Sequence, residues 1–407
     1  MIMKTAFFVG LFFCVVSLSA SEYVMLSPLD TAALPVIAER DYGGVLVRKF
    51  MQGDWIWDKN RKELVESNFS AESMKRSMES LYRHTHKHMV SFSCAYWSKD
   101  VHGDSLLVSG RIYLPKGREL KGVVVSNHYT IGADYEAPSR AFYMDCSYVM
   151  KGYAVILPDY VGYGLSRDEV HPYLHWRSAA QTAVDLLKCM PDVLDYYGYE
   201  YPKKVVVTGY SQGGAVALGV VRMLDEEPTG WRVEKLYAGA GPYDPAVIFD
   251  YCLTTGETGI PGAVPMIVIG MNDAYDLGLQ MEDCFPEPLL SHYKEWIGSK
   301  ELTMYEISWN IGSTQIDDLL HAKILDRDNP LSMLLYETLQ WNSNVGYDVK
   351  CPAYFLHSVT DNIVPFVTSE YLQEQMPDSR DVTFDFGEYG SHMEGALHFN
   401  KYVYQDL

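Results

Sequence analysis

The sequence is most constrained by residues 203–221, where a strand pattern, a tight turn and a helical pattern follow one another. Val205–Thr208 are all β-branched, which is typical of a strand buried on both faces, and Ala215–Val221 form an apolar, helix-like run. Between them, Ser211 stands in the pattern Gly-x-Ser-x-Gly. In this context the pattern predicts a nucleophilic serine in a strained turn at a helix amino terminus. The alternative is a glycine-rich turn with an ordinary serine.

The glycines of this turn have a steric reason. A sharp turn at Ser211 brings the residues two before and two after it together, and Gly209 and Gly213 fit because neither carries a β-carbon. The whole motif reads Gly-Tyr-Ser-Gln-Gly-Gly. It resembles the nucleophile elbow of the α/β-hydrolase superfamily, most closely that of secretory lipases and esterases.

The rest of the sequence alternates between strand and helix patterns, in the order that this resemblance implies. Two apolar stretches joined by a short polar link, Val90–Trp97 and Ser105–Leu114, predict an antiparallel hairpin. Further strands are expected at 122–126, 154–157, 233–238, 353–357 and 382–386, and helices at 139–150, at 177–197 with Pro191 kinking or splitting it, and from Glu394 or Gly395 onward. The pattern predicts the α/β fold class. The resemblance implies an α/β-hydrolase fold with a mostly parallel twisted sheet, antiparallel N-terminal strands, helices on both faces and a helical cap insertion.

The same alternation divides the chain into a core and two additions. Residues 89–244 and 349–407 carry the core pattern, and residues 21–88 are interpreted as an N-terminal extension. Residues 245–348 lie between two core strands and contain several aromatic-rich, helix-like pieces. We expect them to form a cap above the carboxyl edge of the sheet, with a lid or acyl-binding role. The alternative is an insertion that only packs against the core.

Residues 1–20 have the pattern of a secretory signal peptide. Lys4 precedes an apolar run that ends in small residues, so cleavage is expected near Ala20 and the protein is predicted to be exported to the periplasm, the medium or the cell surface. Phe13 directly before Cys14 disfavours a lipoprotein anchor. No later apolar run is long enough for an integral membrane span, and a net charge of −20 disfavours nucleic acid as a partner.

The cysteines suggest disulfides but do not define them, because sequence alone cannot choose among the pairings of an exported protein. Cys252 and Cys284 share the insertion and are the favoured pair, whereas Cys94 and Cys351 lie in or beside expected strands, where buried free cysteines are common. The cysteines that remain after signal cleavage are Cys94, Cys146, Cys189, Cys252, Cys284 and Cys351.

A metal site is not expected. His84, His86 and His88 would share one face of a strand, as the ligands of a metal would, but no carboxylate or cysteine accompanies them and no Cys-x-x-Cys pattern occurs. A solvated approach to the next strand is the favoured interpretation. Neither a metal nor an organic cofactor is expected to take part in the chemistry.

A serine nucleophile needs a general base, and the base needs a carboxylate that orients it. The resemblance implies the chain order serine, acid, histidine. Asp361 follows the strand at 353–357, where open α/β sheets place their sites, and His392 lies in a glycine-bracketed loop after the last strand. We therefore predict Ser211, Asp361 and His392 as the catalytic residues. The alternatives are a helix-capping role for Asp361 and, as the base, His357 or His398.

Acyl transfer also needs backbone donors for the oxyanion. The N–H of Gln212, at the head of the helix after Ser211, is one candidate. By resemblance, the second is the N–H of Tyr129, in the loop after the strand at 122–126, where many relatives have glycine. His128 is expected to shape this loop. The stretch Asp159-x-x-Gly-x-Gly resembles the turn that supports the oxyanion loop in the superfamily.

These residues predict an exported serine hydrolase that cleaves carboxylic esters, an esterase or lipase acting on a small-molecule or lipid ester. The alternative is an exported serine peptidase of the same fold, for which the sequence shows no group that would hold a peptide terminus. A non-catalytic binding protein of this fold is disfavoured by the intact Ser211, Asp361 and His392.

Overall fold

The computed structural model describes residues 80–376 and 381–407, apart from residue 82, and three short strand segments before them at 24–25, 55–58 and 63–66. The predicted signal peptide, its cleavage near Ala20, the lipoprotein alternative at Cys14 and most of the predicted extension at 21–88 lie outside the described residues. In the described part of the chain, no helix is both long and apolar enough to cross a membrane.

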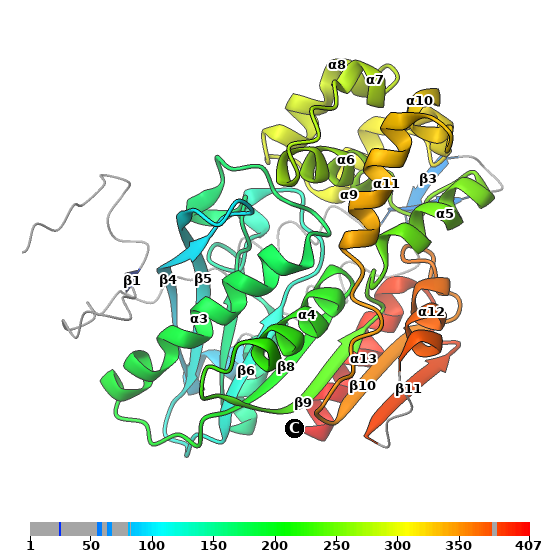
Figure 1. Ribbon diagram of the computed structural model, residues 1–407. Coiled ribbons are helices and arrows are strands. Elements are labelled where there is room, and N and C mark those ends of the chain that lie inside the picture. The colour runs from blue at the N-terminus through cyan, green and yellow to red at the C-terminus, as the bar shows by residue number, and fades with distance from the viewer. Residues whose placement is uncertain (1–23, 26–54, 59–62, 67–79, 82, 377–380) are drawn as a thin grey trace, which may run out of the picture.

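A twisted, mostly parallel sheet forms the centre of the molecule (Figure 1). Its strands have the spatial order β1-β4-β5-β7-β6-β8-β9-β10-β11. β5 is antiparallel to both β4 and β7, and every neighbouring pair from β7 to β11 is parallel. The strands are β1 (Val24–Met25), β4 (Met89–Lys99), β5 (Ser105–Pro115), β6 (Gly122–Asn127), β7 (Tyr153–Pro158), β8 (Lys204–Tyr210), β9 (Arg232–Gly239), β10 (Ala353–Ser358) and β11 (Val382–Gly387). A separate hairpin pairs β2 (Trp55–Asp58) with β3 (Glu63–Glu66).

Helices cover both faces of the sheet, which explains the β-branched run in β8. Val205 and Val207 pack into the core beneath α3 (Trp176–Tyr196) and α4 (Gln212–Glu226). Val206 points to the other face, toward the 3₁₀ helix η3 (Met144–Lys151) and α13 (His392–Asp406). A strand that is buried on both faces needs apolar residues at every position rather than at alternate ones.

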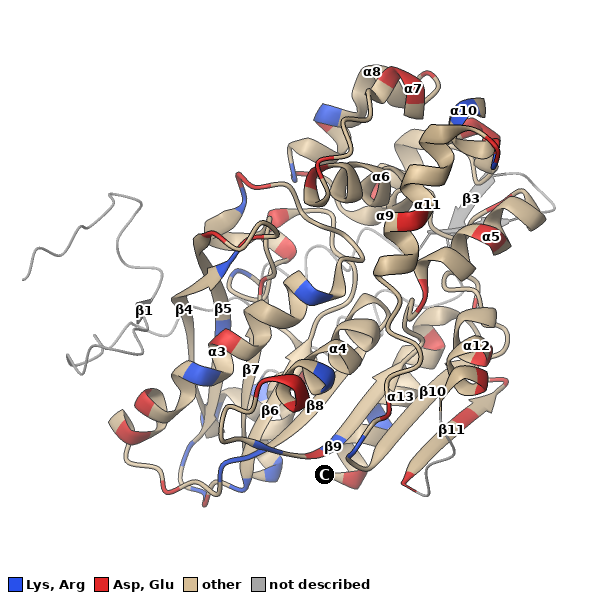
Figure 2. Ribbon diagram, viewed as in Figure 1, with Lys and Arg blue, Asp and Glu red and all other residues tan. Residues whose placement is uncertain are grey.

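Figure 2 shows acidic and basic residues interspersed along the outer helices, whereas the central strands are mostly uncharged. The charged residues of β8 and β9 lie within their first four positions, at the amino ends of these strands. The carboxyl ends of both strands are therefore apolar or neutral, and a single ionised group placed at that edge meets little competing charge from the strands.

Most of the expected core elements are confirmed, and Pro191 does not split α3. The helix predicted at 139–150 is wrong in its first part, because only η3, from Met144 onward, is helical. The backbone of Ser139 instead bonds to buried side chains: its N–H donates to Asp159 Oδ1 (2.7 Å) and its carbonyl accepts from Arg111 (2.7 Å). The last helix, α13, begins at His392, earlier than expected, because Ser391 and Glu394 form a capping box.

Residues 245–348 form a series of helices that share an apolar core of their own. They lie beyond the carboxyl ends of the strands (Figure 1). They pack closely on the core where Gly259 meets Asn362 and where Gly270 meets Tyr173, because a β-carbon would lie 1.9 Å and 2.8 Å from the backbone there. Their elements are α5 (Pro245–Thr255), α6 (Ala263–Ala274), α7 (Met281–Cys284), α8 (Leu289–Tyr293), η5 (Lys294–Gly298), α9 (Met304–Ile311), η6 (Ile316–Asp318), α10 (Ala322–Leu325) and α11 (Pro330–Trp341).

The favoured disulfide between Cys252 and Cys284 is wrong, because all six described cysteines are free and buried. Cys252 and Cys284 both pack in the apolar core of residues 245–348, where burial raises the pKa of each thiol, to about 11 for Cys252 and about 12 for Cys284. The expectation of a buried free thiol at Cys94 is confirmed, and its Sγ donates to the carbonyl of Gly110 (3.5 Å).

Candidate active site

The turn after β8 holds Ser211 in a backbone conformation that non-glycine residues rarely adopt, with φ 59° and ψ −130°. Two glycines make the turn sterically feasible. A β-carbon on Gly209 would lie 2.1 Å from the carbonyl oxygen of Gly213, and one on Gly213 would lie 2.0 Å from the carbonyl oxygen of Asn127. Ser211 thereby becomes the residue that precedes α4, with its side chain at the carboxyl edge of the sheet and only 7% exposed.

The structure brings Asp361 and His392 together across two loops of the same edge. Asp361 follows β10 and His392 follows β11, and His392 Nδ1 lies 2.6 Å from Asp361 Oδ2. The other carboxylate oxygen, Oδ1, accepts the N–H groups of Ile363 (2.8 Å) and Val364 (2.9 Å). Asp361 therefore makes the predicted contact with one oxygen and holds its own loop with the other. The helix-capping alternative is wrong, because the next helix begins at Val367 and has no side-chain cap.

Asp361 stays ionised despite its burial. Burial by itself would raise the pKa of this carboxyl, but the charge of His392 and hydrogen bonds from His357 and His392 outweigh it and hold the pKa well below its ordinary value. A carboxylate that keeps its charge beside an imidazole fixes the proton on Nδ1 and leaves Nε2 free to act as a base.

His392 is held from two further sides. Its backbone N–H donates to Asn362 Oδ1 (3.0 Å), and its carbonyl accepts from the hydroxyl of Tyr210 (2.9 Å). The Tyr210 and His392 ring centroids are 4.9 Å apart. Since Tyr210 directly precedes Ser211, the same residue links the turn after β8 to His392 at the start of α13.

The structure does not join the Ser211 hydroxyl to His392 by a hydrogen bond, and within the described residues neither Ser211 Oγ nor His392 Nε2 has any other partner. Such contacts are often long in ligand-free enzymes and shorten when a substrate binds. Of the three predicted catalytic residues, two are therefore in contact, and the third stands free at the same edge.

The two predicted oxyanion donors follow the neighbouring strands β6 and β8 at this edge. Gln212 is the first residue of α4, where backbone N–H groups have no acceptor within the helix. Tyr129 lies in the loop after β6 and is 38% exposed, and its carbonyl contacts His128 Nδ1 (2.7 Å). Its ring lies beside that of Tyr143, with centroids 5.8 Å apart.

Buried side chains support the loop that carries Tyr129. His128 stacks on Tyr160 with ring centroids 4.0 Å apart, and its Nε2 lies 3.2 Å from the carbonyl of Asp159. Burial lowers the pKa of His128 to about 4, so the ring is neutral at pH 7. The Asp159 carboxylate accepts from Ser109 (2.5 Å) and from the N–H of Ser139 (2.7 Å). These contacts agree with the shaping role expected for His128 and Asp159.

No family model matches the sequence. Over 260 residues it is 24% identical to Lipase 6 of Candida albicans, an alignment that covers 58% of this chain and 50% of that protein, so the chain spans about half the length of the curated relative that it matches.

Superposition on solved structures identifies the fold. A putative hydrolase of Legionella pneumophila superposes with a TM-score of 0.70 at 17% identity, covering 80% of this chain and 93% of the other. The chain has the α/β-hydrolase fold. Two further structures share it: the rice cell wall degrading esterase LipA of Xanthomonas oryzae (TM-score 0.65, 18% identity, 80% and 92% covered) and lipase A of Candida antarctica in its closed state (TM-score 0.61, 16% identity, 80% covered in each).

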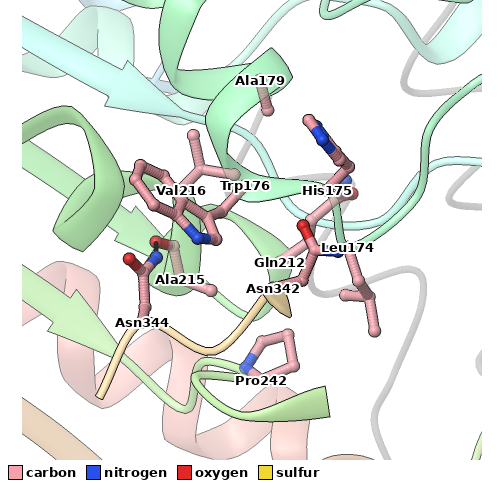
Figure 3. A pocket seen from close by; sticks show the side chains of 10 residues that line it. All are labelled: Leu174, His175, Trp176, Ala179, Gln212, Ala215, Val216, Pro242, Asn342 and Asn344. Carbon is pink, nitrogen blue, oxygen red and sulfur yellow. Dashed lines mark hydrogen bonds between the residues drawn. The ribbon is translucent and has the colours of Figure 1, made fainter. Parts of the chain in front are cut away.

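Within this α/β-hydrolase fold, a small cavity lies beside the turn after β8 (Figure 3). It measures about 10 Å³, which is roughly the room for one water molecule. It lies between the start of α3, the first turns of α4 and the segment that returns from α11 to β10. A bound acyl chain needs far more volume, so this cavity is not the substrate site. Its lining residues are Leu174, His175, Trp176, Ala179, Gln212, Ala215, Val216, Pro242, Asn342 and Asn344.

A further histidine supports the site through contacts that the sequence does not predict. His171 Nδ1 contacts the carbonyl of Val161 (2.7 Å), and its Nε2 lies 3.2 Å from Gln212 Nε2. Burial lowers the pKa of His171 to about 3, so its neutral ring accepts from Gln212 and ties the head of α4 to the loop after β7. No signal in the sequence pairs positions 171 and 212, which are far apart along the chain.

The remaining histidine alternatives have other surroundings. His398 lies exposed on α13 and stacks on Tyr389 with ring centroids 4.2 Å apart. His86–His88 form the 3₁₀ helix η1 rather than a strand, so the alternation that would have aligned them on one face does not apply. Among the described residues, no three His, Cys, Asp or Glu side chains are grouped to hold a metal ion.

Proposed function

We propose that the protein is an exported serine hydrolase that cleaves carboxylic esters through an acyl-enzyme on Ser211. The observation that carries this proposal is the 2.6 Å contact between His392 and the buried, ionised Asp361, at the sheet edge where Ser211 is held in a strained turn. Ester hydrolysis is supported by the comparisons, which include proteins named as lipases and as an esterase. The substrate is a small-molecule or lipid ester.

In this mechanism, His392 Nε2 takes the proton from Ser211 Oγ as the oxygen attacks the ester carbonyl. Asp361 holds the ring and stabilises the imidazolium that forms. The N–H groups of Gln212 and Tyr129 donate to the oxyanion. His392 then gives its proton to the departing alkoxide, which leaves as the alcohol. Water, deprotonated by His392, releases the acid from Ser211. Neither a metal nor a cofactor takes part.

Residues 245–348 form the cap in this proposal, and they enclose the acyl or alcohol part of the ester. The close contacts of Gly259 and Gly270 with the loops after β10 and β7 support this role, because both loops border the proposed catalytic residues. Residues 89–244 and 349–407 form the core that holds the site.

Replacement of the nucleophile tests the proposal. Ser211→Ala should lower kcat for p-nitrophenyl acyl esters by about a thousandfold or more, because the acyl-enzyme cannot form. It should also abolish labelling by a fluorophosphonate. Ser291→Ala, at an exposed serine of α8, is the matched control and should keep both. Full ester hydrolysis by Ser211→Ala would refute the mechanism, and faster turnover of aminoacyl-arylamides than of any ester would favour a peptidase.

Export is tested on the amino terminus of the mature protein. After expression of the full sequence in a secreting host, the protein recovered outside the cytoplasm should begin near Ala20, as measured by intact mass. Recovery only inside the cells, with residues 1–20 still attached, would contradict this part of the proposal.

A further inference from the structure

A second histidine lies against the proposed catalytic acid, at the same carboxylate oxygen that His392 contacts. His357 is near the end of β10 and is completely buried, and its Nε2 lies 3.3 Å from Asp361 Oδ2. The same nitrogen lies 3.2 Å from the carbonyl oxygen of Val364. The other ring nitrogen, Nδ1, lies 2.7 Å from the hydroxyl of Ser369, on α12 (Val367–Gln375).

These neighbours assign the proton on the His357 ring. Both neighbours of Nε2 are acceptors, a carboxylate and a carbonyl, so Nε2 must carry a hydrogen. Nδ1 faces a hydroxyl, and a hydroxyl can donate to a bare ring nitrogen. A neutral His357 with its proton on Nε2 therefore satisfies all three contacts. This matters because a side chain buried this deeply must find its hydrogen-bond partners within the protein.

Asp361 depends on protein donors for the same reason, since its side chain is 0% exposed. Its Oδ1 accepts two backbone N–H groups, from Ile363 and Val364. Its Oδ2 faces two imidazoles, those of His392 and His357. During the proposed reaction the His392 ring changes its charge. Among the described residues, His357 is then the side-chain donor at Oδ2 whose own charge need not change.

We propose that His357 is a positioning residue, whose Nε2–H holds Asp361 Oδ2 in the orientation that accepts the Nδ1–H of His392. This inference rests on the proposed function, because it gives His357 a role through Asp361. The carboxylate would otherwise be fixed by Oδ1 alone and could turn about that anchor. The His392 ring would then lose its alignment with Ser211.

Two replacements of similar size separate the donor from the packing. His357→Leu removes the donor, whereas His357→Gln keeps an N–H near the position of Nε2. His357→Leu should lower kcat for p-nitrophenyl esters about 10- to 100-fold with KM unchanged, a size typical of a lost contact that orients a reacting group. His357→Gln should recover most of this loss. The downfield proton resonance of His392 Nδ1–H should weaken or shift in the leucine variant and persist in the glutamine variant.

Equal kcat values in the two variants, or a wild-type kcat in His357→Leu, would overturn the proposal. Thermal melting shows whether each variant folds. If the leucine variant does not, the wild-type protein with ¹⁵N-labelled histidine decides the question: the proposal requires a proton on His357 Nε2, and a bare Nε2 refutes it. This readout needs no activity, so it remains decisive even if Ser211→Ala keeps full activity and the proposed function fails.

Discussion

At the scale of single residues, the turn after β8 depends on two positions that have no room for a β-carbon. Ser211 adopts its strained conformation only because Gly209 and Gly213 leave room for each other and for the chain at Asn127. The strain has a structural consequence: it points the serine side chain away from the strand and places it directly before the free N–H groups of α4.

Gly213→Ala tests this steric account. Its β-carbon would lie 2.0 Å from the carbonyl oxygen of Asn127, so either the turn or the loop after β6 must shift. We expect the free energy of unfolding to fall by about 2–4 kcal/mol and ester hydrolysis to fall more steeply than the folded fraction. Urea denaturation and kcat on the same sample measure both. Gly298→Ala is the control, because a β-carbon there meets nothing within 4 Å. Equal effects of the two substitutions would contradict the account.

The residue scale also shows where sequence reasoning stops. Asp361 and His392 could be singled out because each follows a strand of the predicted sheet, and the structure brings them into contact. The roles of His171 and His357 could not be assigned, because each depends on partners that only tertiary packing supplies: Gln212 for His171, and Asp361 Oδ2 for His357.

At the scale of elements, strands were easier to predict than helices. β6, β7 and β10 are buried at every position, so their uninterrupted apolar runs identify them without any partner. The segment before η3 looked helical in sequence but is drawn out of the helix by the buried side chains of Arg111 and Asp159. Such competition for backbone groups is decided by residues distant in the chain, which local patterns do not contain.

The cysteines illustrate the same limit at the scale of elements. Cys252 and Cys284 belong to one helical unit, which made them the favoured pair, but their helices α5 and α7 each bury a thiol against apolar neighbours. A pairing argument from shared location fails because a disulfide needs specific distances and directions between the β-carbons. The buried thiols behave as small apolar side chains.

At the scale of the whole molecule, a cluster of charged residues joins residues 245–348 to two loops of the core. Arg167 lies 3.0 Å from Glu301 and 3.6 Å from Asp134, and the N–H of Asp134 donates to the carbonyl of Lys300 (2.8 Å). Lys300 Nζ also donates to the carbonyls of Arg167 and Glu169. Together with the close packing at Gly259 and Gly270, these contacts hold the helical unit over the edge where Ser211 lies.

Three buried histidines lower the stability of the whole molecule at acid pH. Burial lowers the pKa values of His128, His171 and His175 from an ordinary 6.5 to about 4, 3 and 4. Between these values and pH 6.5 the unfolded chain binds protons that the folded chain does not, so stability is complete above about pH 6.5 and falls as the pH drops. Asp361 adds to this only at lower pH: its pKa is also depressed, and the stability it gives is retained until the pH falls below its ordinary value of 3.8.

We therefore expect the free energy of unfolding, measured in urea from pH 7.5 to pH 4.5, to fall steeply below pH 6.5. Each buried histidine can contribute up to about 1.4 kcal/mol per pH unit. His171→Asn keeps a donor near the position of Nδ1 but has no titrating ring, so its acid slope should be shallower than that of the wild type by up to this amount. Ser291→Ala should keep the wild-type slope. An unchanged slope in His171→Asn would show that this histidine is protonated in the folded chain, and its neutral contact with Gln212 would then have to be abandoned.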